Sequence, residues 1–345
     1  MKIRISRIVR IITVLPIIAF CIGFFGASSL KTDALQNKNK EALVSNQTSA
    51  KERYTFLLLG EDDAAELSDM IAIVSFDTIN QTMCVLQIPR DTYAEYTSAA
   101  YRKINAASHI LGGGEKLADF LSSNLGIEID YFLTIDLDVI AKAVDVLGGV
   151  EIDVPNDMEY QDPYQNLCID IKKGKQTLDG EKAKQFIRYR DSYLRGDLGR
   201  LDAQKMFISA FIKKLTEKND VLTLVNLSSI ILPEIESNLS YKECLEIIKR
   251  IGIPKASNIQ FITLPGGDVQ GSSGAWYYIM NRSAAYNIVK EYFSPSLLES
   301  DFDNNRKFTS FVRDGFNKIY ESGNGFEAKI YSAEEINGGI DIETK

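Results

Sequence analysis

The chain has 345 residues, of which 45% are hydrophobic, and its formal net charge is −8 at pH 7. This length and hydrophobic content suffice for one large core, or for a core with a small appendage. The acidic balance and the lack of a basic stripe with interleaved aromatic residues argue against nucleic-acid binding. His109 is the only histidine, which nearly rules out a histidine-based nucleophilic triad or a metal cage of several histidines.

The N-terminus has the pattern of a membrane anchor. Residues 1–10 carry four basic side chains and no acidic one, and residues 11–30 are largely apolar. A helix needs about 20 apolar residues to cross a bilayer, and basic residues before it keep that end in the cytoplasm. We therefore expect a cytoplasmic tail at 1–10, a transmembrane signal-anchor helix at 11–30 and an extracellular remainder. A cleaved signal peptide is the alternative, but its apolar core usually has only about 7–15 residues.

Residues 31–52 are polar without a hydrophobic period and predict an extracellular linker. The four cysteines are scattered and form no Cys-x-x-Cys pair. A zinc site is therefore improbable, and buried thiols are favoured over a disulfide.

Apolar runs and turn residues then alternate along the chain. Helix-period patterns and caps predict helices around 117–125, 139–147, 198–215, 241–251 and 283–292, and a further helix that starts at 179–184. Strands are predicted at 54–59, 70–76, 82–88, 131–135, 150–154 and 259–264, with short ones at 328–331 and 339–342. Strands interleaved with helices indicate an α/β sandwich.

Two aspartates follow or precede predicted strands. Asp62 lies in the turn after the first strand, and Asp69 directly precedes the second. Carboxylates at facing ends of neighbouring strands can share one Mg²⁺, with phosphate oxygens of a substrate completing the octahedron. The alternative is that both aspartates only cap turns.

Six arginines crowd the same part of this acidic chain: Arg90, Arg102, Arg188, Arg190, Arg195 and Arg200. The planar, permanently charged guanidinium suits phosphate oxygens. Arg188 and Arg190 point to one face if the chain is extended there, and diverge in a helix. Together with the aspartates, these arginines predict a phosphate or pyrophosphate substrate held with a metal.

Further polar residues accompany the arginines. Lys103 can reach a phosphate as a point charge, and Asn105 can bind backbone or ligand. Asp197, Arg200 and Gln204 share one face of the predicted long helix, because they are spaced three and four residues apart. The alternative is a surface ion pair with a polar neighbour.

In this order, the motifs resemble those of the LytR-CpsA-Psr family of bacterial cell-envelope enzymes. The match is close over about residues 54–215 and looser to about 290. The matching segments are Leu57–Asp62, Ser68–Asp69, Gln87–Thr92, Lys103–Ala107, Gly112–Gly114, Asp145–Pro155, Gly174–Ala183, Arg188–Arg190, and Asp197–Arg200 with Gln204.

The resemblance implies a single-pass type II protein of the cell membrane whose catalytic domain, residues 53–293, is extracellular and is followed by an extension at 294–345. It implies an α/β/α sandwich around a central mixed β-sheet. The family transfers glycopolymers from a polyprenyl-pyrophosphate carrier to peptidoglycan, and both would be partners here, as would the membrane. Teichoic acid, capsule and other polymers all remain open as cargo.

The resemblance also assigns roles. It implies catalytic roles for Asp62, Arg90, Arg188, Arg190 and Arg200, and Mg²⁺ binding by Asp62 and Asp69. It implies substrate binding by Asp91, Lys103, Asn105, Asp197 and Gln204. Asp62 and Asp91 are both candidates for the general base.

The chain departs from the family pattern at Glu61, Leu67, Met70 and Ala203. These departures leave two alternatives open beside the transferase. One is a hydrolase that uses water at the same site, and the other is a non-catalytic protein that binds envelope polymers or regulates their assembly.

Overall fold

The structure is a computed structural model, and it describes residues 51–62, 67–97, 102–162, 167–218, 227, 234–240, 243, 247, 255–270, 274–303, 311 and 329–344. The predicted cytoplasmic tail, the anchor, nearly all of the linker and most of the helix expected at 241–251 lie outside these ranges. Within them, no helix has the length and apolar character needed to span a bilayer.

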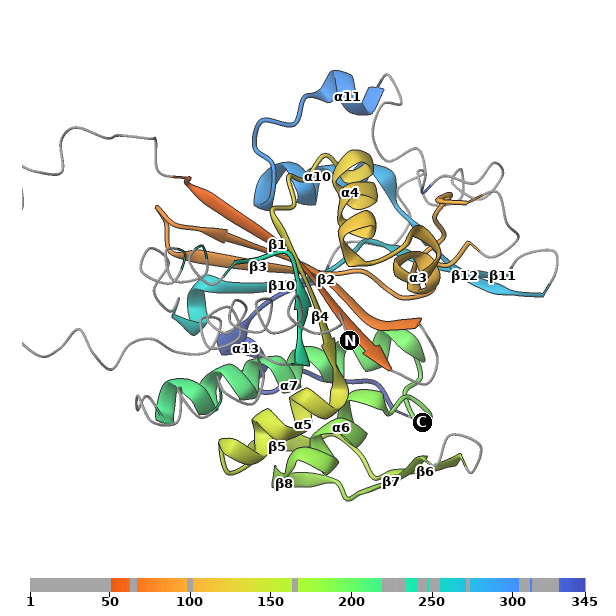
Figure 1. Cartoon of the computed structure of the whole chain (residues 1–345). Coiled ribbons are helices and arrows are strands. Elements are labelled where there is room, and N and C mark those ends of the chain that lie inside the picture. Colours follow the sequence, from red (N-terminus) through yellow and green to blue (C-terminus); the bar gives the residue numbers. More distant parts are fainter. Residues whose placement is uncertain are drawn as a thin grey trace, which may run out of the picture.

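A seven-stranded mixed sheet crosses the centre of the molecule (Figure 1). β1 lies near its middle, antiparallel to β2 on one side and parallel to β4 on the other. In spatial order the strands are β13 (Ile330–Ser332), β10 (Ile259–Thr263), β3 (Thr82–Gln87), β2 (Leu67–Asp77), β1 (Arg53–Asp62), β4 (Tyr131–Asp136) and β9 (Glu236–Ser237).

Helices cover both faces of this sheet, which confirms the expected α/β/α sandwich (Figure 1). Along β1, Leu57 and Leu59 enter the core on one face, while Tyr54 and Phe56 enter the core on the other. Because both faces are buried, the central strands read as continuous apolar runs. One layer contains α4 (Gly114–Leu125) and α10 (Arg282–Tyr292), and the other contains α5 (Leu137–Val146), α6 (Gly180–Arg188) and α7 (Asp197–Lys218).

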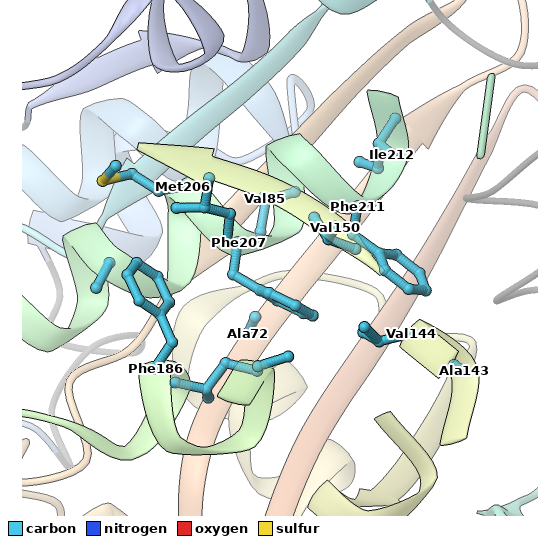
Figure 2. Packing of buried hydrophobic residues seen from close by; sticks show 14 of the residues in the cluster. Ala72, Val85, Ala143, Val144, Val150, Phe186, Met206, Phe207, Phe211 and Ile212 are labelled. Carbon is cyan, nitrogen blue, oxygen red and sulfur yellow. The ribbon is translucent and has the colours of Figure 1, made fainter. Parts of the chain in front are cut away.

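The larger core joins α5, α6 and α7 to the sheet (Figure 2). Phe207 and Phe211, one turn apart on α7, stack with ring centroids 5.7 Å apart. Phe186 of α6 and Val144 of α5 are fully buried in the same cluster. This packing fixes the start of α7 and the end of α6, from which several of the predicted site residues project.

Some predicted strands lie outside the main sheet, and others were missed. The strand expected at 150–154 exists as β5 (Val150–Val154), but among the described strands it pairs only with β8 (Gly174–Leu178). The hairpins β6–β7 (Met158–Asp162, Leu167–Ile171) and β11–β12 (Gly266–Gln270, Trp276–Met280) were not predicted, because β6 is largely polar and β11 begins with two glycines. The strand expected at 339–342 is wrong, since the chain is irregular after α13 (Ala333–Gly338).

The cysteines agree in part with the expectation of buried thiols. Cys84 is buried in β3, whereas Cys168 of β7 is exposed, and both are free thiols. Cys244 lies outside the described residues.

The C-terminal segment packs against the long helix. β13 forms one edge of the sheet, and the Ser209 hydroxyl of α7 donates a hydrogen bond of 2.9 Å to the Ala333 carbonyl. The fully buried Lys205 ammonium contacts Asp202 at 2.6 Å and Thr263 at 2.7 Å, and lies 5.8 Å from the ring centre of Tyr331. Residues far apart in sequence therefore stabilise α7 together.

We expect Ile336→Ala to destabilise the whole domain, because Ile336 of α13 is only 3% exposed. Removing a buried aliphatic side chain of this size costs about 2–5 kcal/mol. The matched variant Asn337→Ala alters an exposed neighbour and should stay within about 0.5 kcal/mol of the parent. Urea unfolding monitored by far-UV circular dichroism measures both. Equal stability of the two variants would mean that α13 is not part of the cooperative unit.

Candidate active site

A β-bulge presents Asp69 at the end of the β1–β2 ladder. Gly60 pairs with Met70, and the next pair is Glu61 with Ser68, so Asp69 has no opposing residue. A bulge of this kind re-aims a side chain and is common beside active sites. Gly60, which pairs with Met70 next to the bulge, leaves room for this close approach, because a Cβ at position 60 would lie 2.9 Å from the Met70 Cβ.

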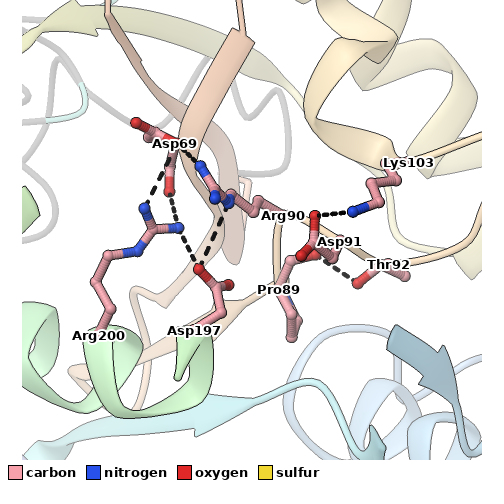
Figure 3. A network of polar contacts seen from close by, with 8 residues as sticks. All are labelled: Asp69, Pro89, Arg90, Asp91, Thr92, Lys103, Asp197 and Arg200. Atoms are coloured by element: carbon pink, nitrogen blue, oxygen red, sulfur yellow. Dashed lines mark hydrogen bonds and ion pairs between the residues drawn. The ribbon is translucent and has the colours of Figure 1, made fainter. Parts of the chain in front are cut away.

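Two arginines converge on the Asp69 carboxylate (Figure 3). Arg90 follows Pro89 at the end of β3, and its Nη1 lies 2.5 Å from Asp69 Oδ1. Arg200 comes from the first turns of α7, and its Nη1 lies 3.5 Å from the same oxygen. The cluster is therefore assembled from three separate segments of the chain.

Asp197 ties the two arginines together. Its Oδ1 lies 2.6 Å from Arg200 Nη2 and 3.5 Å from Arg90 Nε. The predicted helical face with Asp197 and Arg200 is confirmed, but the pair is not a surface one, because the Arg200 side chain is only 3% exposed. A buried guanidinium requires such carboxylate partners.

The arginines control the ionisation of Asp69. Burial by itself would raise the pKa of this carboxyl, but the positive charges of Arg200 and Arg90, together with the Arg90 hydrogen bond, hold it below its ordinary value of 3.8. The pKa of Arg90 is raised, because the charges of Asp69 and Asp197 outweigh its desolvation. Both groups are therefore fully charged at neutral pH.

Arg188 and Arg190 reach this cluster from the end of α6. Asp179 caps the start of α6 by accepting a hydrogen bond from the Lys182 amide at 2.9 Å. Gly180 lets α6 approach α5 closely, because a Cβ there would lie 2.2 Å from the Ala141 carbonyl oxygen. Arg188 is the last helical residue, and the chain continues in extended form through Tyr189. The extended alternative weighed from the sequence thus describes the segment after Arg188.

A cavity of about 200 Å³ lies where these segments meet. The sequence-predicted residues that line it are Asp69, Arg90, Arg188, Arg190 and Arg200. Four arginines at one small cavity attract anions, and guanidinium pairs bind phosphate oxygens in bidentate fashion.

The remaining predicted residues lie beside this cavity without lining it. Lys103 Nζ forms an ion pair of 2.9 Å with Asp91 Oδ1, directly after Arg90 (Figure 3). Asn105 is buried, and its backbone amide donates to the Arg90 carbonyl at 3.1 Å. Gln204 is buried one turn after Arg200. Asp62 ends β1 opposite Leu67, and its side chain lies outside the description.

Two of the six arginines have partners outside the cavity lining. Arg102 pairs with Glu95, and Arg195 lies 3.6 Å from Asp202. These two arginines, to which the resemblance assigned no role, therefore pair elsewhere, because proximity in sequence says nothing of the acids that each arginine meets.

Other lining residues were missed by sequence analysis. The hairpin β6–β7 contributes Tyr160, Leu167 and Ile169, and the chain after α6 contributes Tyr189 and Asp191. The alternating apolar residues Leu167, Ile169 and Ile171 of β7 were the one available signal. This hairpin gives the cationic cavity one apolar wall.

The donor chemistry at the bulge fits Mg²⁺. This ion takes hard oxygen ligands, often one or two carboxylates together with substrate phosphates. Asp69 is an ionised carboxylate, and Asp62 ends the neighbouring strand on the same edge. No group of three or more potential metal-binding side chains occurs within the described ranges. A Mg²⁺ held by Asp62 and Asp69 therefore stays a prediction.

The LytR_cpsA_psr family model matches residues 19–293. The chain belongs to this family. Among curated members, it is 30% identical to the polyisoprenyl-teichoic acid–peptidoglycan teichoic acid transferase TagV of Bacillus subtilis (strain 168). The alignment covers 71% of this chain and 66% of TagV, so the chain spans just under two thirds of that relative's length. It is 29% identical to the corresponding transferase TagU of Bacillus mycoides (strain KBAB4), over 74% of this chain and 83% of TagU.

Solved structures of the LytR_cpsA_psr family share the fold. The crystal structure of B. subtilis TagV superposes with a TM-score of 0.59 at 26% identity, covering 70% of this chain and 97% of TagV. The structure of TagT bound to LIIa-WTA gives a TM-score of 0.54 at 26% identity, covering 70% and 89% of the two chains.

We expect Asp69→Asn to lower the free energy of unfolding by about 1–3 kcal/mol at pH 7, because it removes a charged hydrogen-bond acceptor from two arginines. The folded-state pKa of Asp69 is lowered, so its stabilising contribution is complete well above pH 3.8 and is lost as the pH falls through the folded pKa. The difference between parent and variant should therefore shrink below pH 3.8.

Urea unfolding across this pH range measures that difference. Asp119→Asn is the control, because Asp119 is 66% exposed and pairs only with Lys116 in the described part of the chain. A destabilisation by Asp69→Asn that is unchanged from pH 7 to pH 3 would show that packing, and not the charge, explains it.

Proposed function

We propose that this protein is a phosphotransferase that moves a glycopolymer from a polyprenyl-pyrophosphate carrier to peptidoglycan at the outer side of the cell membrane. The single observation that carries the proposal is the cavity lined by four arginines around the ionised Asp69. The printed functions of TagV and TagU support the same class of donor and acceptor.

The arginines supply the electrostatic part of the reaction. Arg188 and Arg190 line the cavity and bind the pyrophosphate oxygens of the donor. Arg90 and Arg200 are held in fixed orientation by Asp69 and Asp197, so little reorganisation is needed when negative charge builds up on the pyrophosphate. Preorganised donors of this kind give the largest single contribution in many enzymes.

The bond changes follow from the donor's chemistry. A hydroxyl oxygen of the acceptor attacks the phosphorus next to the sugar, and the bond from that phosphorus to the bridging oxygen breaks. The products are a glycan–peptidoglycan phosphodiester and polyprenyl phosphate. The hydroxyl proton passes to a carboxylate, for which Asp62 and Asp91 are the two candidates. Lys103 Nζ lies 2.9 Å from Asp91 Oδ1 and orients this carboxylate.

A Mg²⁺ held by Asp62 and Asp69 would supply further neutralisation of the phosphate charge. The remaining substrate-binding roles belong to Asn105, Asp197 and Gln204, which fix Arg90 and Arg200 or lie beside them. The expected signal anchor at 11–30 would hold the catalytic domain at the membrane surface, where a polyprenyl carrier resides.

The arginine assignment predicts that Arg188→Ala lowers transfer by roughly 100-fold, because one guanidinium that stabilises developing charge is lost. The assay uses the full chain in detergent with Mg²⁺, a short polyprenyl-pyrophosphate-linked sugar and peptidoglycan oligomers, and mass spectrometry of the products. Arg102→Ala is the matched control, because that arginine pairs with Glu95 and does not line the cavity.

The product of the assay distinguishes the three functional alternatives. A sugar-phosphate adduct on the oligomer establishes transfer, and free sugar phosphate would instead indicate the hydrolase. Intact donor that stays bound would favour the non-catalytic protein. Full activity of Arg188→Ala would remove Arg188 from the mechanism.

We also expect chelation with EDTA to abolish transfer and added Mg²⁺ to restore it, because the bound ion would neutralise negative charge on the donor pyrophosphate. Isothermal titration of the free protein with Mg²⁺ gives a second readout, and Asp69→Asn should weaken that binding at least tenfold. Unchanged turnover in EDTA would argue that the arginines alone neutralise the pyrophosphate.

A further inference from the structure

A second surface adjoins the arginine cluster on the side opposite the cavity's apolar wall. The hairpin β11–β12 is joined to the segment after Arg90 by its backbone. The Tyr278 amide donates to the Asp91 carbonyl and the Tyr93 amide donates to the Tyr278 carbonyl, each at 2.9 Å. In Figure 1, β11–β12 and β6–β7 project on the same side of the molecule, one above and one below the ends of β1 and β2.

One face of this hairpin carries both a tryptophan, Trp276, and a carboxylate, Asp268. In the register, Asp268 lies opposite Tyr278 and Gln270 lies opposite Trp276, so these four residues share one face. Tyr277 points to the other face, where it packs edge-on against Tyr93. Trp276 is 55% exposed and is the only tryptophan of the chain.

The charge on this face differs from that of the cavity. Partial desolvation, together with the negative charges of Asp197 and Asp91, raises the pKa of Asp268, and Arg195 and Lys103 oppose that rise. Asp268 is therefore close to the first turn of α7 and to the Arg90–Asp91 segment. The carboxylates on and near this face disfavour the binding of a polyanion, whereas the four arginines of the cavity favour it.

An exposed indole beside a carboxylate suits a neutral polyhydroxylated ring. The indole offers a flat apolar surface to the C–H face of a sugar, and a carboxylate accepts hydrogen bonds from its hydroxyl groups. A phosphorylated ligand has no reason to choose this face over the arginines. The ligand class that fits is a glycan strand.

We propose that the Trp276–Asp268 face of the β11–β12 hairpin is the subsite that binds the acceptor glycan. This inference rests on the proposed function and adds where the second substrate lies. The donor pyrophosphate occupies the arginine cavity, and the acceptor approaches along the hairpin from the other side of Arg90. Separate surfaces of different charge then keep the two substrates from competing for one site.

Because Trp276 is the sole tryptophan, its fluorescence reports directly on this face. We expect peptidoglycan glycan oligomers whose lactyl carboxyl groups are amidated, and which are therefore uncharged, to produce a saturable change in emission from the full chain in detergent, and inorganic pyrophosphate to produce none. In the transfer assay, Trp276→Ala should raise the KM for the oligomer at least tenfold, which corresponds to about 1.4 kcal/mol, and leave the KM for the donor unchanged. Trp276→Phe, which keeps an aromatic face, should restore most of the affinity.

Two further variants sharpen the test. Asp268→Asn should also raise the oligomer KM without weakening pyrophosphate binding. Ile79→Ala removes another exposed apolar side chain, 65% exposed in the turn that follows β2, and should change nothing.

The outcomes separate this inference from the proposed function. If transfer occurs and Trp276→Ala behaves like Ile79→Ala, the acceptor subsite is wrong and the transferase stands. If oligomers change the fluorescence but no transfer is found, the face binds glycan without being an acceptor subsite, and the transferase is wrong. If neither occurs, both are wrong.

Discussion

Charge compensation around Asp69 is the interaction on which the rest of the site depends. A guanidinium as buried as that of Arg200 is costly without a carboxylate partner, and Asp69 and Asp197 provide two. The same aspartates orient Arg90. Removing either acid would leave buried positive charge uncompensated, so the arrangement holds the arginines in place before any substrate arrives.

The fold serves this cluster by bringing three distant segments together. A bulge in β2 turns Asp69 towards it, the end of β3 at Pro89 delivers Arg90, and the first turns of α7 deliver Arg200. α7 is in turn fixed by the large core and by the C-terminal segment, through the Ser209 hydrogen bond to Ala333 and the Lys205 contact with the Tyr331 ring. Packing far from the cavity therefore determines the geometry inside it.

Two hairpins outside the main sheet flank the cluster and differ in chemistry. β6–β7 adds apolar residues next to the arginines, which suits the boundary between a charged pyrophosphate and a lipid chain. β11–β12 carries a carboxylate and an exposed indole, which suits a sugar. The proposed transfer brings two unlike substrates to one phosphorus, and this division of charge would give each of them its own approach.

The layered fold and most of the residues of the cluster could be predicted from the sequence alone. Apolar runs with strand or helix periods predicted β1 to β4, β10, α4 to α7 and α10, because burial on both faces of a sheet leaves a strong local pattern. Ordered motifs around Asp69, Arg90, Arg188 and Arg200 predicted a site for phosphate.

The set of arginines that share the cavity, and the residues that surround them, depend on tertiary contacts. Arg102 pairs with Glu95 and Arg195 pairs with Asp202, and no local sequence pattern predicts these partners. The two flanking hairpins were missed because polar or glycine-rich strands carry a weak hydrophobic signal. The separation of a cationic cavity from a carboxylate-bearing face also depends on contacts between residues far apart in the chain, and such contacts form only when the chain folds.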